Sequence, residues 1–206
     1  MPEDEITKEK IFSAGQDRFW KEGFARISVD EITTDLAMSK KTFYKYFSSK
    51  EDLVRQIMER FMGNVRTNVE RILLSDKSAV EKLSEVITMI GTNASRLTPA
   101  FGQDIKKHIP QLWKHIEEFR RQRISEVFSR LIKQGIDEGT IRPDMNARVF
   151  LMSVLGTIDR IMQPDVLVHE AFSVNGALEE ILSIFFQGGL TNKGRDQFVQ
   201  LHLSEH

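Results

Sequence analysis

Residues 39–50 read SKKTFYKYFSSK, and the interpretation of the whole chain starts from this stretch. It contains four lysines, both tyrosines of the chain, two phenylalanines and no acidic residue. Over all 206 residues, by contrast, acidic side chains outnumber basic ones by 30 to 29, and the formal net charge is -1. Any affinity for a polyanion must therefore come from this local patch, because the molecule as a whole does not attract negative charge.

The stretch has the pattern of a short helix with one apolar face. Ser39 is a good N-cap, and on a helical wheel Phe43 and Phe47 share one side. The remaining side chains point outward or lie on the flanks: Lys41, Thr42, Tyr44, Lys45 and Tyr46. One face can therefore be buried, and the other is left to bind.

Two further helices are expected before this one. Thr7 is the expected N-cap of the first helix, which should end near Gly23. The second helix should begin at Ser28, whose spacing to Glu31 is that of a capping box. A short helix, a tight turn and a second helix with outward basic and hydroxyl groups form a helix-turn-helix, which places its second helix in the major groove of DNA.

A fourth, long helix should begin next to Ser49, which puts Lys50 in its first turn. A cation at this end opposes the helix dipole. Lys50 is therefore unfavourable unless an anion lies nearby, and such local conflicts tend to mark functional positions.

The run from Ile11 to Leu53, with SKKTFYKYF and SSKEDL in order, resembles the N-terminal DNA-binding domain of the tetracycline-repressor (TetR) family. The resemblance implies that Tyr44 and Lys50 hold phosphates, so the anion near Lys50 would be a DNA phosphate. It also implies that the first positions of the reading helix lie at or near bases. With the outward-facing side chains, the expected DNA contacts are Lys40, Lys41, Thr42, Tyr44, Lys45, Tyr46 and Lys50.

The chain departs from the family pattern at two positions. The family often has glycine in the turn before the reading helix, where this chain has Ala37. A left-handed backbone there would cost alanine about 1 kcal/mol, so we expect the turn to differ slightly in shape. The family also frequently has a small residue in place of Lys41, so the base preference cannot be copied from a relative.

The fold class is all-α, because apolar residues recur at helical spacing and alternating runs are scarce. We expect an N-terminal three-helix helix-turn-helix domain over 1–49, followed by a larger helical domain for ligand binding and dimerisation over 50–189. Residues 190–206 are expected to form a C-terminal tail.

Two of the later helices, expected at 147–162 and 177–185, are unusually apolar. A helix that is apolar around most of its circumference must be buried on all sides. In a chain this short, one side would face its own domain and another a second copy, which predicts a homodimer with a four-helix interface. The expected interface residues are Leu155, Ile158, Leu178, Ile181 and Phe185.

The second domain is also rich in large flexible or flat apolar side chains. Each of them alone belongs to a core more often than to a pocket, but as a set they permit an apolar effector cavity of the kind that the resemblance implies. The expected pocket residues are Phe61, Met62, Met89, Phe101, Trp113, Phe119 and Met152. The sequence does not name the ligand.

Other classes of function find little support. The chain has no cysteine, which excludes disulfides and thiolate sites, and no nucleophile elbow, phosphate loop or zinc-helix signature, so no catalytic residue and no cofactor are expected. Asp104, His108, Gln111 and His115 could share a helix face, but Pro110 interrupts that helix, so no metal site is expected. The polar start MPEDEITKEK and the lack of a run of about 20 apolar residues predict a cytoplasmic protein with no membrane partner.

These patterns predict a homodimeric transcriptional regulator, a repressor that reads a palindromic operator in double-stranded DNA and is released by a small apolar or amphipathic effector. One alternative keeps DNA binding but makes the second domain a module that recruits a protein partner. The other is a helical enzyme or metal-binding protein whose basic helix is only a surface. The operator, the effector and the sign of regulation stay open.

Overall fold

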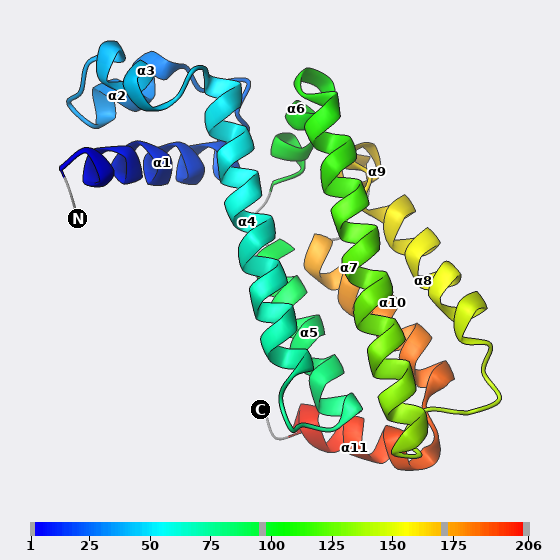
Figure 1. The fold of residues 1–206 in the computed structure, drawn as a ribbon. Coiled ribbons are helices and arrows are strands. Elements are labelled where there is room, and N and C mark those ends of the chain that lie inside the picture. Colours follow the sequence, from blue (N-terminus) through cyan, green and yellow to red (C-terminus); the bar gives the residue numbers. More distant parts are fainter. Residues whose placement is uncertain (1–2, 95–97, 170–172, 204–206) are drawn as a thin grey trace. The chain divides into compact units, whose positions relative to one another are not determined.

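The computed structural model describes residues 3–94, 98–169 and 173–203, and within these ranges the chain forms eleven helices and no sheet (Figure 1). The expected all-α class is confirmed. The helices are α1 (Glu3–Glu22), α2 (Val29–Asp35), α3 (Lys40–Tyr46), α4 (Lys50–Leu73), α5 (Ala79–Ala94), α6 (Pro99–His108), α7 (Pro110–Asp137), α8 (Ala147–Ile161), α9 (Pro164–His169), α10 (Val174–Gly189) and α11 (Asn192–Leu203).

The chain divides into two compact units. Unit 1 comprises Met1–Asn64 and Arg96–Ile116, and unit 2 comprises Val65–Ser95 and Glu117–His206. Unit 1 therefore extends beyond the 1–49 domain expected from sequence, because the first part of α4 and all of α6 share the core of the first three helices. The segment expected as a tail forms α11 within unit 2.

Unit 1 is held together by a core of aromatic and aliphatic side chains. Phe43 and Phe47 are fully buried in it, with ring centroids 5.6 Å apart, which confirms that they anchor the third helix. Burying a phenylalanine side chain contributes about 1.5–3 kcal/mol, so either change to alanine would loosen α3. α1 passes close to α4, because a Cβ at Gly15 would meet Leu53 Cδ2 at 2.6 Å.

The helix boundaries of unit 1 follow the expected caps except at the N-terminus. Thr7 is not an N-cap: α1 begins at Glu3, and Thr7 Oγ1 donates to the Glu3 carbonyl within the helix, at 2.9 Å. Three acidic side chains in the first turn favour the earlier start. The predicted end near Gly23 is confirmed, since Gly23 has φ 82, and so is the N-cap at Ser39.

Unit 2 has its own apolar core. Val154 of α8, Leu131 of α7 and Phe186 of α10 are buried in it, and the rings of Phe128 and Phe186 stack at 5.3 Å. These side chains come from three helices, α7, α8 and α10, so the core depends on several helices at once.

The start of α11 is hydrogen-bonded to the loop that follows α7. Thr191 donates from its backbone nitrogen to the Thr140 carbonyl at 3.0 Å and from its hydroxyl to the Gly139 carbonyl at 2.8 Å. A Cβ at Gly194 would collide with the Thr140 carbonyl oxygen. Residues 139–140 and 191–194 therefore form a joint in which backbone packs directly against backbone.

Two kinds of feature are absent from the described residues. No helix among them combines the length and apolar character that crossing a membrane requires. No group of three or more His, Asp or Glu side chains among them is arranged to hold a metal ion.

Candidate nucleic-acid interface

The turn between α2 and α3 keeps the left-handed backbone of a tight helix-turn-helix. Ala37 has φ 50, and its backbone nitrogen donates to the Thr34 carbonyl at 3.0 Å. The next nitrogen, of Met38, donates to the Thr33 carbonyl at 2.8 Å. The expected change of shape is therefore not found: Ala37 adopts the strained conformation itself, at a cost of about 1 kcal/mol.

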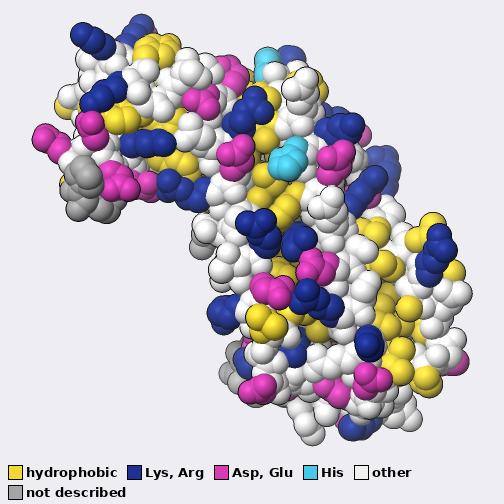
Figure 2. Space-filling view, in the orientation of Figure 1, with side chains coloured by type: hydrophobic (Ala, Val, Ile, Leu, Met, Phe, Trp, Pro, Cys, Tyr) yellow, Lys and Arg dark blue, Asp and Glu magenta, His cyan; other side chains and the backbone are white. Residues whose placement is uncertain are grey.

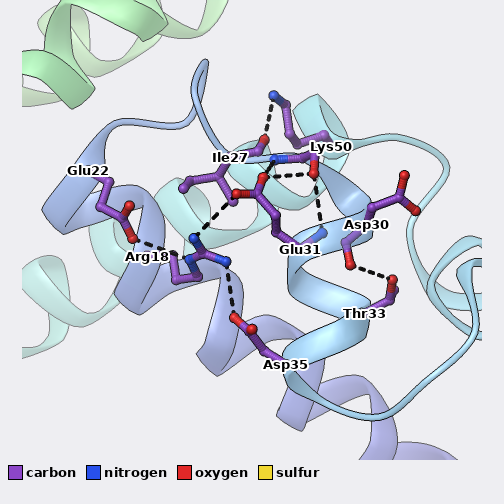
Figure 3. A network of polar contacts seen from close by, with 9 residues as sticks. Arg18, Glu22, Ile27, Asp30, Glu31, Thr33, Asp35 and Lys50 are labelled. Atoms are coloured by element: carbon purple, nitrogen blue, oxygen red, sulfur yellow. Dashed lines mark hydrogen bonds and ion pairs between the residues drawn. The ribbon is translucent and has the colours of Figure 1, made fainter.

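Arg18 of α1 ties α1 to α2 (Figure 3). Its guanidinium lies 3.2 Å from Glu22 in its own helix, 3.7 Å from Glu31 and 3.0 Å from Asp35, both in α2. Glu31 also closes the predicted capping box, which is confirmed: it accepts from the Ser28 backbone nitrogen at 2.7 Å. The helix that precedes the turn is thus fixed at both of its ends.

The outward face of α3 carries three side chains that could reach DNA. Lys41 is exposed and forms no ion pair within the described part of the chain. Tyr44 is 53% exposed, while its ring packs edge-on against Phe43 at 5.3 Å. Thr42 lies beside them, with its hydroxyl 3.0 Å from that of Ser39. The helix thus has one face in the core and another in solvent.

Three more of the expected DNA contacts are engaged by acidic side chains. Lys40 lies 2.7 Å from Asp30, while Asp4 accepts from Lys45 Nζ at 2.6 Å and from the Tyr46 hydroxyl at 2.7 Å. The hydrogen bond from Lys45, and then that from Tyr46, holds the pKa of Asp4 below its usual value. These pairs are solvent-exposed and exposed pairs are weak, so a DNA phosphate could replace either carboxylate. Sequence reasoning missed Asp4.

Lys50 finds its partners inside unit 1. Its ammonium donates to the Ile27 carbonyl at 2.8 Å (Figure 3). It also donates to the Phe24 carbonyl at 2.8 Å and lies 5.4 Å from the centre of the Phe24 ring. The cation at the start of α4 is therefore compensated by two carbonyl dipoles of the α1–α2 loop. An ammonium has three donors, so one N–H is left for a phosphate, and that contact stays a prediction.

The residues expected to line an effector pocket are divided between the units. Unit 1 holds Phe61, Met62, Phe101 and Trp113, and unit 2 holds Met89, Phe119 and Met152. Phe101 is buried in the core of unit 1 beside Phe24, with ring centroids 6.5 Å apart. Met152 is 64% exposed on α8. Within their own units, then, Phe101 is a core residue and Met152 a surface residue.

The expected dimer residues are mostly turned inward. Ile158, Leu178 and Ile181 are buried in the core of unit 2, and Leu155 and Phe185 are half-buried. Among the side chains that the structure describes on α8 and α10, the large apolar ones that are exposed are Val149, Met152 and Ile184, at 59%, 64% and 61%. Hydrophobic side chains also gather on the surface over α8 in Figure 2. The exposed apolar side chains thus lie on the two helices expected to form the interface, and that these helices form a dimer stays a prediction. The sequence did not indicate which face is exposed, because α8 is apolar nearly all round.

Comparison with known proteins places these features in a wider group. Residues 11–57 match the family model described as bacterial regulatory proteins, tetR family. The uncharacterized HTH-type transcriptional regulator YvaF of Bacillus subtilis (strain 168) is 24% identical over 170 residues, which cover 82% of this chain and 87% of that protein. The matched segment of the family model contains α2, the turn, α3 and the first turns of α4.

Two solved structures share the fold over almost their whole length. The transcriptional regulator FadR from Bacillus subtilis, in complex with stearoyl-CoA, is 19% identical with a TM-score of 0.63, and covers 87% of this chain and 98% of its own. A gamma-butyrolactone receptor described as ArpA-like is 19% identical with a TM-score of 0.70, and covers 96% of this chain and 95% of its own. The all-α architecture therefore extends beyond the helix-turn-helix.

Proposed function

Because this chain belongs to the TetR family of transcriptional regulators, we propose that it represses transcription by binding a palindromic operator as a homodimer. The observation that carries the proposal is the two-sided character of α3. Phe43 lies in the core, whereas Lys41, Thr42 and Tyr44 lie in or near solvent. A helix fixed in this way can enter the major groove without disturbing the unit that holds it.

The side chains of α3 would contact different parts of the DNA according to their chemistry. Lys41 and Thr42, at the start of the helix, would reach base edges and set specificity. The Tyr44 hydroxyl and the Lys45 ammonium would contact phosphates, which fixes the register of the helix but carries no sequence information. Lys50 would add a phosphate contact through its third N–H. Lys40 and Tyr46, once separated from their acidic partners, would contribute in the same way.

The homodimer is supported by the exposed apolar side chains of α8 and α10. Val149, Met152 and Ile184 would otherwise stand in water. Two helices from each subunit would cover them in a four-helix interface, and the dimer axis would match the symmetry of a palindromic operator.

The effector of the proposal is an apolar or amphipathic small molecule that binds unit 2. Half-buried Met89 and Phe119 there offer apolar surface of the kind that ligand sites use. One structural neighbour, FadR from Bacillus subtilis, was solved in complex with stearoyl-CoA, and another is a gamma-butyrolactone receptor, so both are associated with ligands of this chemistry. Such a ligand lowers the affinity for DNA only by as much as it binds more tightly to the dimer state that does not fit the operator.

The proposal can be tested by selecting an operator from random DNA and measuring the affinity of three variants. Lys41→Ala and Thr42→Ala should each lose roughly 1–3 kcal/mol on the selected operator and much less on random DNA. Lys133→Ala, which removes an exposed lysine from α7, is the control and should bind as the wild type does. Unchanged specificity in both α3 variants would show that α3 is not the reading helix.

The effector can be tested separately with a library of apolar and amphipathic compounds. A ligand at a hundredfold excess over its Kd should stabilise the protein by about 2.7 kcal/mol and lower its affinity for the operator. If no compound does either, the second domain would be better explained as a module that recruits a protein partner.

A further inference from the structure

A groove on the surface of unit 2 is lined by arginines from two helices. Arg66 and Arg71 come from α4 and Arg123 from α7, with Thr67 and Glu70 between them. Figure 2 shows Lys and Arg side chains, with acidic ones beside them, over the region where α4 and α7 run in Figure 1. The groove lies within one compact unit and shares no residue with the helix-turn-helix.

The acidic side chains near this groove are already engaged. Glu70 accepts from Arg130, whose Nη1 lies 3.2 Å from each carboxylate oxygen. Glu126 pairs with Arg123 at 2.6 Å and with Arg130 at 3.0 Å. Arg66 and Arg71 are exposed and form no ion pair with any described residue. Four arginines thus face two glutamates, which leaves two positive charges uncompensated.

One of the arginines also has an unused donor. The Nε of Arg123 is enclosed and has no hydrogen-bond partner in the described structure, although the same guanidinium pairs with Glu126. A buried donor without an acceptor costs free energy, and native structures leave few such groups. The guanidinium of Arg123, which lines the groove, therefore keeps one donor that no described group satisfies.

We propose that the groove binds a phosphate group with close to two negative charges, as inorganic phosphate or as a phosphate monoester. Guanidinium groups are planar forks that bind phosphate oxygens in pairs, and three of them line this one groove. A phosphate monoester carries close to two negative charges at neutral pH, which match the two uncompensated positive charges, whereas a carboxylate carries one. Bound there, the group would join α4 to α7 through a single anion.

This site is separate from the apolar effector of the proposed function and does not depend on it. The phosphate could be a free ion or the head of a larger organic ester. The two sources share the chemistry of the site and differ in what extends from the groove, so they can be told apart by affinity. An ester that also contacts the neighbouring surface should bind more tightly than inorganic phosphate.

The test is calorimetric titration of the full-length protein with inorganic phosphate and, in a second arm, with octyl phosphate. Sodium chloride at the same ionic strength is the blank. We expect saturable binding of at least one of the two, weakened about tenfold or more in the double variant Arg66→Gln/Arg71→Gln. Arg55→Gln removes an exposed arginine of the same helix outside the groove, and should bind as the wild type does.

The outcomes separate clearly. Equal affinities for the two probes indicate that the phosphate group alone is recognised, and tighter binding of octyl phosphate indicates an organic ester. Circular dichroism checks that the double variant folds. Arg66→Lys keeps the positive charge but loses the paired donors of the guanidinium, so it should bind with intermediate affinity. The proposal is overturned if neither probe binds saturably, or if the folded double variant binds both as tightly as the wild type.

Discussion

The carboxylate of Asp4, in the first turn of α1, lies 2.6 Å from the ammonium of Lys45 in α3 and accepts its hydrogen bond. The same carboxylate accepts a hydrogen bond from the Tyr46 hydroxyl at 2.7 Å. A DNA phosphate would accept hydrogen bonds from the same two kinds of donor, an ammonium and a hydroxyl. If Lys45 and Tyr46 contact DNA phosphates as proposed, Asp4 occupies these two groups in the free protein, and DNA would have to displace it.

Replacing Asp4 should make this competition visible. Asp4→Asn is expected to raise affinity for DNA of any sequence, because Lys45 no longer gives up an anionic partner. The slope of log affinity against log salt should steepen by up to about 1.8 per dimer, or 0.9 for each subunit. Glu5→Gln makes the same change of charge one residue away and is the control. If the two variants bind alike, the contact with Asp4 does not restrain Lys45.

The capping box of α2 should give a characteristic pH dependence. The Ser28 backbone N–H, followed by the Ser28 hydroxyl, holds the pKa of Glu31 below its usual value. A lowered pKa in the folded state means that the contribution of Glu31 is fully present above about pH 4.3, the ordinary value, and is lost as pH falls through the folded pKa. The Tm of Glu31→Gln should therefore lie below that of the wild type at pH 7, and the gap should close below pH 4. The exposed Glu59→Gln variant should show no such convergence.

The strained turn predicts a stabilising substitution. Ala37→Gly removes the steric penalty of a left-handed alanine, and the gain is reduced by the greater freedom of glycine in the unfolded chain. We expect a net gain of up to about 0.5 kcal/mol in the free energy of unfolding, measured by denaturant titration. Ala100→Gly, within helix α6, should lose stability instead. A loss at both positions would mean that the turn does not depend on the backbone of Ala37.

Lys50 is expected to contribute both to the stability of the folded protein and to its affinity for DNA. Lys50→Ala removes the hydrogen bonds to Phe24 and Ile27, so the free protein should unfold at a lower temperature. If the third N–H also binds a phosphate, the salt slope of DNA binding should shrink by about 1.8 per dimer. Thermal unfolding without DNA and salt titrations with operator DNA measure the two effects separately. A lower Tm with an unchanged slope would confine Lys50 to a structural role.

The dimer interface can be tested by comparing exposed and buried positions on the same helices. Met152→Glu and Ile184→Glu place a charge on the exposed apolar surface, so they should give monomers that keep their helical content. Ile181→Glu instead places a charge in the core of the subunit and should unfold or aggregate the chain. Light scattering and circular dichroism distinguish the two results. A wild-type protein that is monomeric at micromolar concentration would contradict the dimer.

Features that depend on interactions between residues close in sequence could be predicted from the sequence. Ser39, Phe43 and the Ser28–Glu31 box act over three or four residues, and the sequence pattern was enough to predict them. Thr7 was wrongly predicted to be an N-cap, because a threonine hydroxyl can also donate to a carbonyl within a helix, as Thr7 does to Glu3. The acidic residues before it favour an earlier start of the helix.

Long-range contacts could not be predicted in this way. Asp4 finds its partners 41 and 42 residues away, and Lys50 finds carbonyls 23 and 26 residues away. On α8 and α10, apolar residues on most sides left the orientation of each helix undetermined, so Ile158 and Ile181 were assigned to an interface although they fill the core. Helix existence followed from the pattern, whereas orientation required the packed structure.

The joint between the loop after α7 and the start of α11 limits how this part of the chain can vary. At Gly194 the obstacle to a side chain is the backbone oxygen of Thr140, which no change of rotamer can move aside. Gly188, a few residues earlier, has nothing within 4 Å of the place where a Cβ would lie. Gly188 can therefore be replaced by other amino acids over evolutionary time. Gly194, six positions later, can be replaced only if the C-terminal helix also moves away from the loop.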